Sequence, residues 1–514
     1  MGIGDVAEGL TQLGVQRVFA VPGGGTSLEL LDMLSRSGTD VVTPHHEAVA
    51  AVMAGIGHRV TDQIAATCTI KGPGVANLLP GLACCRLERW PVIAISESYG
   101  PDTAPAIVHK RMDHRALTAG AAKAHGIAAS HSDVEQAGTV AIDDEPGPVA
   151  LDLIPNWLGP GFTGEPTAKT DGQTDRSGLT HVESARRPIV IAGTAALRNG
   201  WGPSLAQLSV PIFTTAAAKG LIDERLPHSA GVYTGVGLEL APERRLLVEA
   251  DLIVGFGLRS SELLKSTTHD VPTVLVDDHA SALSEGIDAS ATLANSCASD
   301  VIAALSHHNW GDGLVNEVHQ HLQRRLAVLG FSPATLLPDA EEMMAVGTRL
   351  VVDTGDFCTV AEHVWRAHHR SAFLGTGQSR YMGMGIPMAL GAAVADPDRV
   401  TILAVGDGGI GSHFGELSLA VERKLPLLVL FMSDGGMSSI IGRALATGRT
   451  TSFLERRHQR WRFAAEALGM DAATVNSQDG ALDVISSWKP DTGPLFVECS
   501  FPIDSYRAMS TNLR

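Results

Sequence analysis

The chain contains few aromatic residues and no cysteine pattern typical of a metal or redox site. Phe, Trp and Tyr make up 5% of its 514 residues, and the apolar fraction of 44% suits a soluble α/β protein rich in aliphatic residues. The six cysteines include no Cys-x-x-Cys pair and lie mostly in apolar surroundings. Reduced structural thiols in a cytoplasmic protein are therefore expected.

Positive charge is also scarce, since the formal net charge is −17. A protein that binds nucleic acid needs a cationic face to displace counterions from phosphates, so no nucleic-acid partner is expected. The N-terminus has no basic start followed by a long apolar run. A signal peptide and a membrane span are therefore not expected.

A chain of this length is too long for one core, and two to four domains of ordinary size are expected. Apolar strand patterns alternate with helical patterns in three blocks, which predicts three consecutive doubly wound parallel-sheet domains of the α/β class. A polar linker is expected at 159–180. The predicted domains are 1–158, 181–308 and 335–514, with strands at 17–21, 40–43, 64–69, 92–96, 149–153, 189–192, 212–214, 252–256, 274–276, 349–353, 400–405, 427–432 and 495–498.

A Gly-Asp-Gly sequence follows the predicted strand 400–405 and contains Asp407. The next predicted strand ends just before Asp434, which lies 434 − 407 = 27 residues later. Strand, crossover helix and strand place both carboxylates at one edge of a parallel sheet, where glycines let backbone amides approach a phosphate. Gly-Asp-Gly alone is common in turns. Together with the second carboxylate, it indicates a magnesium clamp for a cofactor with a diphosphate tail.

This spacing resembles that of the thiamin-diphosphate enzymes, whose signature is Gly-Asp-Gly followed by Asn at this distance. The order of three α/β domains resembles the acetohydroxyacid synthase and pyruvate decarboxylase branch. The resemblance implies a pyrimidine-binding domain, a middle Rossmann-like domain and a diphosphate-binding domain. It also implies thiamin diphosphate and Mg²⁺ as cofactors, with active sites between the subunits of a homodimer or homotetramer.

Glu47 is the candidate catalytic residue, because Pro44-His45-His46-Glu47-Ala48 resembles the family's His-Glu-x-x-Ala element. In the family this carboxyl group bonds to the aminopyrimidine ring and drives the tautomer that deprotonates the thiazolium. A glutamate that merely starts a helix is the alternative interpretation.

The resemblance also implies contacts to the rest of the cofactor. Met382 would be the hydrophobic wedge between the two rings, with the carbonyl of Arg380 receiving the ring amino group. A methionine among glycines is also compatible with a plain core position. Asp434 departs from the family's Asn, although a carboxylate still suits Mg²⁺. The expected cofactor contacts are Pro22, Gly23, Glu47, Asp356, Phe357, Arg380, Tyr381, Met382, Asp407, Gly408, Gly409, Asp434, Gly436, Met437 and Ser438, with Asp407, Asp434 and the Gly436 carbonyl as metal ligands.

Departures from the family shape the predicted reaction. Gly24 and Ile440 stand where pyruvate decarboxylases carry acids that protonate the carbanion, so carboligation is favoured over release of an aldehyde. Arg443 stands where acetohydroxyacid synthases place a tryptophan. Lys71 and Lys110 add cations to the expected pocket, which favours a substrate with a second anionic group. Solvated surface charge is the alternative reading of these cations.

The predicted function is thiamin-diphosphate- and Mg²⁺-dependent decarboxylation of a small 2-oxo acid. The acyl carbanion would be transferred to an aldehyde or ketone acceptor, as in an acetolactate synthase, or protonated. Two alternatives stay open, namely a flavin-linked 2-oxo acid oxidase on the same fold and a noncatalytic cofactor-binding paralogue. The middle block has only a weak dinucleotide signal around Gly255 and Gly257, so no flavin is expected.

Overall fold

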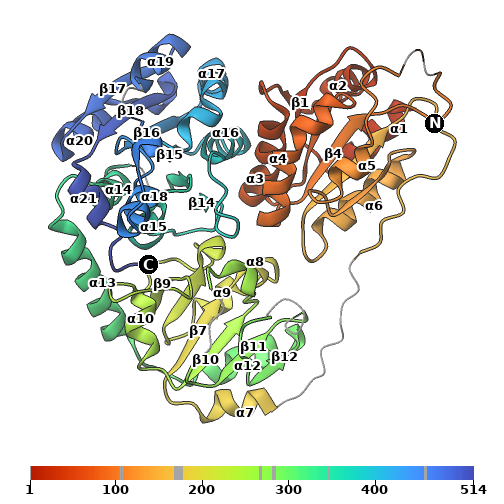
Figure 1. Cartoon of the computed structure of the whole chain (residues 1–514). Helices are drawn as coiled ribbons and strands as arrows, with labels where there is room; N and C mark the ends of the chain where they lie inside the picture. The colour runs from red at the N-terminus through yellow and green to blue at the C-terminus, as the bar shows by residue number, and fades with distance from the viewer. Residues whose placement is uncertain are drawn as a thin grey trace. The chain divides into compact units, whose positions relative to one another are not determined.

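The chain forms three six-stranded parallel sheets, each covered by helices (Figure 1), as the sequence predicts. The computed structural model describes residues 2–104, 106, 108–166, 177–265, 269–279, 285–344, 347–456 and 460–514. Residues 167–176 of the predicted linker lie outside this set, and helix α7 (Ser177–Ser184) begins at the linker's end.

Contacts divide the chain into two compact units. The first unit contains the first sheet together with residues 386–398 and 412–426, and the second unit contains the other two sheets. The first sheet has the order β2-β1-β3-β4-β6-β5. Its elements are α1 (Ile3–Gln12), β1 (Arg17–Val21), α2 (Thr26–Arg36), β2 (Asp40–Val42), α3 (Glu47–Thr61), β3 (Ala65–Thr69), α4 (Pro73–Glu88), β4 (Val92–Glu97), α5 (His114–Thr118), β5 (Ala124–Ile127), α6 (His131–Ile142) and β6 (Pro148–Leu153), joined by most of α16 (Gly385–Ala395) and by α17 (Leu417–Glu422).

The second unit contains sheets of order β12-β11-β10-β7-β8-β9 and β14-β13-β15-β16-β18-β17. The elements of the middle sheet region are β7 (Pro188–Ala192), α8 (Thr194–Arg198), α9 (Gly202–Leu205), β8 (Ile212–Thr215), β9 (Ser229–Tyr233), α10 (Pro242–Leu247), β10 (Leu252–Phe256), β11 (Thr273–Val276), β12 (Ala291–Leu293), α12 (Ala298–Leu305) and α13 (Asp312–Ala327). The elements of the third are α14 (Pro333–Met343), β13 (Arg349–Val352), α15 (Asp356–Val364), β14 (Phe373–Gly375), β15 (Thr401–Gly406), β16 (Leu427–Ser433), α18 (Ser438–Ala446), α19 (Trp461–Leu468), β17 (Asp471–Val475), α20 (Gln478–Ser487), β18 (Leu495–Ser500) and α21 (Ile503–Ala508).

Each sheet has a central point where the chain, after adding strands on one side, continues on the other side of its first central strand. In the first sheet the chain moves from β1 outward to β2 and then returns to β3 on the other side of β1. In the third sheet the same reversal separates β13 from β15, and in the middle sheet it separates β7 from β10. Such a switch point leaves a crevice at the carboxyl ends of the strands, where α/β proteins bind ligands.

The predicted strands are confirmed, but five further strands were missed. The missed strands are β5, β9, β12, β14 and β17, and each one lies at the edge of its sheet. Edge strands contact one neighbour instead of two, so they need fewer apolar residues. The sequence Asp-Ala-Ala-Thr-Val of β17, for example, is mostly not fully buried and carries little strand signal.

Helix α3 is buried on every side over its first three turns. All residues from Glu47 through Gly57 are buried, because α3 packs between the first sheet, α4 and residues of α16. Small residues make these approaches possible. A Cβ at Gly81 of α4 would lie 2.2 Å from the carbonyl oxygen of Ala48, and one at Gly391 of α16 would lie 2.6 Å from the Cα of Met53. This close packing holds the start of α3 in a fixed position.

None of the helices in the described ranges is long and apolar enough to cross a bilayer.

We predict that Gly81→Ala destabilises the protein by about 1–3 kcal/mol, because the new methyl group has no room beside the backbone of α3. Urea unfolding followed by circular dichroism measures the change. Gly4→Ala is the matched control, since Gly4 also lies in a helix but a Cβ there meets nothing within 4 Å. This control should be neutral or stabilise by about 0.5 kcal/mol. Equal stabilities for the two variants would contradict the packing argument.

Candidate cofactor and active site

Two carboxylates meet at the carboxyl edge of the third sheet, as the sequence predicts. Gly406 pairs with Met432 in the β15–β16 register, so the residues that follow both strands are neighbours. Asp407 Oδ2 accepts hydrogen bonds from the backbone N–H groups of Asp434, at 2.9 Å, and Gly435, at 3.2 Å. Asp434 Oδ1 accepts one from Gly436 N at 3.2 Å.

The electrostatics of this pair suit a cation. Burial, together with the neighbouring charge of Asp407, raises the pKa of Asp434 to about 8, and burial raises the pKa of Asp407. Asp434 Oδ2 is buried without a hydrogen-bond partner. No group of three His, Cys, Asp or Glu side chains placed to hold a metal occurs within the described part of the chain. A metal here would therefore need further oxygens, such as a backbone carbonyl and a ligand's phosphate oxygens.

Met382 lies on the surface of this edge rather than in the core. Its side chain is 46% exposed, which removes the core interpretation. A Cβ at Gly408 would lie 2.8 Å from Met382 Sδ, and one at Gly409 would lie 1.9 Å from Asp353 Oδ2. Asp353 in turn accepts hydrogen bonds from Gly383 N at 2.9 Å and Thr354 N at 2.8 Å. The glycines therefore let Met382 and its turn pack directly against the Asp407 loop.

The other predicted cofactor contacts near the third sheet differ in how their side chains are placed. Arg380 has a left-handed φ of 51°, and its guanidinium binds the buried Glu362 on α15. Phe357 is only 1% exposed and belongs to the core, so only its backbone can face a ligand. Asp356 is the first residue of α15, and Tyr381 directly precedes Met382. Met437 and Ser438 lie at the start of α18.

Glu47 is the first residue of α3 and is buried. Its Oε2 accepts a hydrogen bond of 3.1 Å from Asn77 Nδ2 of α4. A Cβ at Gly74 would lie 3.4 Å from Glu47 Oε1. Residues 71–77 and the predicted carboxylate are therefore brought together.

A buried glutamate that the sequence analysis missed organises the neighbouring turn. Glu97 ends β4 and accepts hydrogen bonds from Ser27 N at 2.9 Å, Ser27 Oγ at 2.6 Å and Lys71 Nζ at 2.7 Å. Burial opposes its ionisation, but the bonds from Lys71 and Ser27 lower the pKa of Glu97. Ser27 Oγ also accepts a bond from Gly23 N. Its position directly after the predicted strand 92–96 is the feature of the sequence that could have identified Glu97.

A second missed pair supports the glycine loop. His114 Nε2 accepts a hydrogen bond of 3.0 Å from Gly72 N, so its Nδ1 carries the proton and donates to Asp152 Oδ1 at 2.7 Å. Burial opposes ionisation of Asp152, but the bonds from His114 and His125 lower its pKa. No motif marks this contact, because the three residues are far apart in the sequence.

The predicted substrate residues lie in both units. In the first unit Lys71 pairs with Glu97 and lies 4.9 Å from the ring centroid of Tyr99, and the Arg111 guanidinium lies 5.7 Å from the same ring. Lys110 is exposed with a left-handed φ of 67°. In the second unit Ile440 and Arg443 are exposed on α18. Gly24 is exposed in the turn after β1.

Comparison with known proteins agrees with this geometry. Residues 3–117 match the thiamine pyrophosphate enzyme N-terminal TPP binding domain, 179–305 its central domain and 353–499 its C-terminal TPP binding domain. The chain belongs to the thiamine pyrophosphate enzymes, in the branch that resembles acetohydroxyacid synthase and pyruvate decarboxylase.

Individual relatives are distant but cover most of the chain. A probable acetolactate synthase large subunit of Methanococcus aeolicus is 24% identical over 82% of this chain and 78% of its own length. A probable 2-ketoarginine decarboxylase of Pseudomonas aeruginosa is 27% identical over 84% and 81%. The chloroplastic acetolactate synthase of Arabidopsis thaliana is 24% identical over 97% and 81%. These similarities support thiamin-diphosphate-dependent chemistry on a 2-oxo acid.

We predict that Asp434→Asn retains thiamin diphosphate and Mg²⁺. The amide keeps an oxygen ligand and removes the like-charge repulsion with Asp407. Calorimetric titration with both ligands measures the affinity. Asp407→Asn is the contrasting variant, because Asp407 also accepts two backbone N–H groups, and it should weaken binding at least about tenfold. Complete loss of holoenzyme in Asp434→Asn would show that the second charge itself is required.

Proposed function

We propose that the protein decarboxylates a small 2-oxo acid with thiamin diphosphate and Mg²⁺ and transfers the acyl group to an aldehyde or ketone acceptor. When bound, thiamin diphosphate supplies the nucleophilic carbon and the electron sink for this chemistry. The observation that carries the proposal is the position of Glu47, buried at the start of α3 with Asn77 as partner. The proposed oligomer is a homodimer or homotetramer in which the two half-sites come from different subunits.

Glu47 is proposed to hold a proton at its carboxyl group for exchange with the aminopyrimidine ring. Because the first unit packs tightly around α3, the carboxyl group is held in place rather than mobile. Asn77 fixes one of its oxygens and leaves the other free for a ring nitrogen. Pro22 and Gly23 would line the pyrimidine beside it.

The third sheet is proposed to hold the diphosphate and the metal. Asp407, Asp434 and the Gly436 carbonyl would bind Mg²⁺, with Gly408 and Gly409 lining the diphosphate. Asp356, Phe357, Met437 and Ser438 would contribute from the starts of α15 and α18, whose N–H groups favour an anion. The exposure of Met382 and its contact with the Gly408 position support its role as the wedge between the rings, beside Arg380 and Tyr381.

Transfer to an acceptor is favoured over protonation. No acid stands at Gly24 or Ile440, and both positions are exposed. Without a proton donor at these two positions, transfer of the acyl group to a carbonyl would be favoured over its protonation. Arg443, also exposed on α18, is proposed to face the acceptor. In this respect the protein would act like an acetolactate synthase.

A second anionic group on the substrate is proposed from the cations of the first unit. Lys71 is neutralised by Glu97, so it positions the loop more than it attracts an anion. Lys110 has no ion-pair partner in the described part of the chain. Lys110 and the neighbouring Arg111 therefore provide the uncompensated positive charge, which suits a carboxylate, sulfonate or phosphonate.

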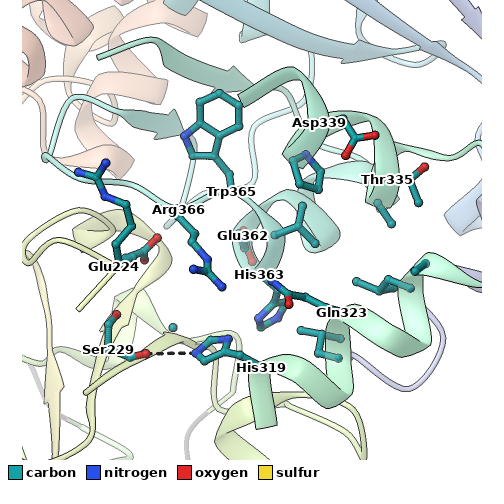
Figure 2. Close-up of a pocket in the computed structure, with 18 of the residues that line it drawn as sticks. Glu224, Ser229, His319, Gln323, Thr335, Asp339, Glu362, His363, Trp365 and Arg366 are labelled. Atoms are coloured by element: carbon teal, nitrogen blue, oxygen red, sulfur yellow. Dashed lines mark hydrogen bonds between the residues drawn. The ribbon is translucent and has the colours of Figure 1, made fainter. Parts of the chain in front are cut away.

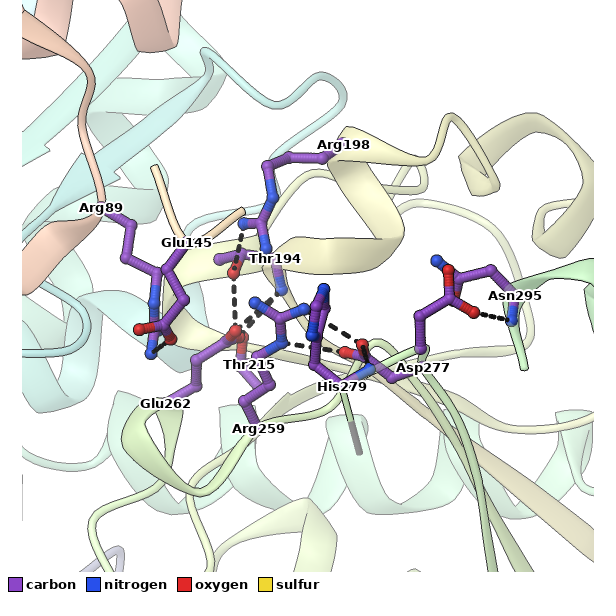
Figure 3. Close-up of polar contacts among 11 residues, drawn as sticks. Arg89, Glu145, Thr194, Arg198, Thr215, Arg259, Glu262, Asp277, His279 and Asn295 are labelled. Atoms are coloured by element: carbon purple, nitrogen blue, oxygen red, sulfur yellow. Dashed lines mark hydrogen bonds and ion pairs between the residues drawn. The ribbon is translucent and has the colours of Figure 1, made fainter. Parts of the chain in front are cut away.

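The two alternatives receive less support. At the middle switch point Glu262 accepts hydrogen bonds from Thr194 N, Thr194 Oγ1 and Thr215 Oγ1 (Figure 3). A Cβ at Gly193 would lie 2.3 Å from the Gly257 carbonyl. Glu262 thus directs its oxygens at groups of the protein itself, which supports the expectation that no flavin diphosphate binds at this switch point. The noncatalytic paralogue is disfavoured because a plain scaffold does not need a buried Glu47.

We predict that Glu47→Gln lowers the rate of hydrogen–deuterium exchange at C2 of bound thiamin diphosphate by about 100-fold or more. Affinity for the cofactor should change far less, because the amide keeps a hydrogen-bonding group. Nuclear magnetic resonance after acid quench measures the exchange. Glu29→Gln is the matched control, since Glu29 lies in the first turn of α2 and is exposed. Wild-type exchange in holo Glu47→Gln would overturn the proposal.

We predict a preference for dianionic substrates. The ratio kcat/KM should be higher for 3-sulfopyruvate, 3-phosphonopyruvate or oxaloacetate than for pyruvate. Lys110→Gln should reduce that preference about tenfold, because one charge-assisted contact is lost. Lys489→Gln, an exposed lysine of the second unit, should leave it unchanged. Equal kcat/KM of the wild type for pyruvate and the dianions would contradict the proposed anion pocket. It would not affect the interpretation of the Glu47→Gln result.

A further inference from the structure

A cavity of about 760 Å³ lies in the second unit, apart from the Asp407 loop (Figure 2). Its walls come from α13, α14, the end of α15 and residues 219–231. The volume falls in the range of small-molecule sites, about 300–1,000 Å³. None of the residues assigned to thiamin diphosphate, magnesium or substrate lines it.

One side of the cavity is apolar. Val315, Leu322 and Leu326 lie on one face of α13, and Phe331 and Ala334 continue this wall toward α14. Leu322 and Leu326 are 2% and 4% exposed and belong to a hydrophobic core cluster. The apolar part of a ligand would displace water from this surface, which favours binding.

The opposite side carries a cation without an ion-pair partner. Figure 2 shows the Arg366 side chain directed into the space bordered by Glu224, His319 and His363. Its backbone N–H donates to Glu341 Oε2 at 3.1 Å, but its guanidinium has no ion-pair partner in the described ranges. Burial raises the pKa values of Glu224 and Glu341, and the positive charge of Arg366 opposes this rise in both.

A buried carboxylate oxygen beside this cation lacks a partner. The Glu224 side chain is 5% exposed. Its Oε2 binds Lys219 Nζ and accepts a bond of 2.8 Å from Ala367 N, whereas its Oε1 accepts no hydrogen bond. His363 Nδ1 is likewise buried without a partner, and burial lowers the pKa of His363 to about 4, so its ring is neutral. Both residues line the cavity, and buried polar atoms without a partner are costly unless water or a ligand bonds to them.

We propose that this cavity binds a small organic monoanion with an apolar body and one hydrogen-bond donor. The carboxylate or sulfonate would lie on Arg366, the donor would reach Glu224 Oε1, and the body would lie against Leu322 and Leu326. Lys219 is paired with Glu224 and Arg225 with Asp223, so Arg366 is the lining cation without an ion pair among the described residues, and the site favours a single negative charge. The binding site is separate from the proposed catalytic site and does not depend on it.

The test uses 8-anilinonaphthalene-1-sulfonate, which has a sulfonate, an apolar body and one N–H donor. The full-length protein, saturated with thiamin diphosphate and Mg²⁺, is titrated with this probe by fluorescence and calorimetry. One site per chain is expected, displaced by octanoate but not by octylamine. Arg366→Leu should weaken binding about tenfold or more, because a charge-assisted contact is lost.

Two further variants separate the site from general effects. Gln323→Trp places bulk in the cavity from a residue that lines it yet is exposed, so it should abolish binding without unfolding the protein. Arg325→Leu removes an exposed cation of α13 outside the cavity and should bind as the wild type does. Absence of binding, displacement of the probe by added thiamin diphosphate in the apo protein, or unchanged binding in both Arg366→Leu and Gln323→Trp would overturn the proposal.

Discussion

Buried carboxylates that accept backbone N–H groups hold the loops at the carboxyl edges of all three sheets. Glu97 binds the start of α2, Asp353 binds the turn at Gly383, Asp407 binds the turn at Gly435, and Glu262 binds the start of α8. A hydrogen bond to a charged group contributes about 1.5–3 kcal/mol, which offsets the cost of removing the charge from water. Without these acceptors the loops would lose the fixed shape that a binding site requires.

The three sheets share one topology but use their switch points differently. In the first and third sheets the crevice is lined by glycines and by carboxylates that keep a free oxygen, such as Glu47 and Asp434. In the middle sheet Glu262 directs both of its oxygens at the protein's own groups, and Gly193 lies against the Gly257 backbone. Glu262 is thus fully bonded within the protein, whereas Asp434 keeps an oxygen without a hydrogen-bond partner.

Strand prediction succeeded where burial was complete on both faces. Strands β15 and β16 are buried over almost their entire length, and such strands appear in the sequence as continuous apolar runs bounded by turns. Edge strands such as β5 and β17 were missed because one of their sides needs no apolar contact. The short edge strand β2 was predicted although two of its three residues are only partly buried.

The linear sequence alone determined the order of the three α/β domains and the neighbouring positions of Asp407 and Asp434, because both depend on local patterns along and after strands. Glu47 was selected by resemblance to a family motif, and its role stays a prediction. Only the tertiary structure decided that Glu97 neutralises Lys71, that His114 and Asp152 support Gly72, and that Arg366 lies beside a cavity. Those contacts join residues that are distant in the chain. Their partners are chosen by packing of whole elements, and no local pattern encodes that choice.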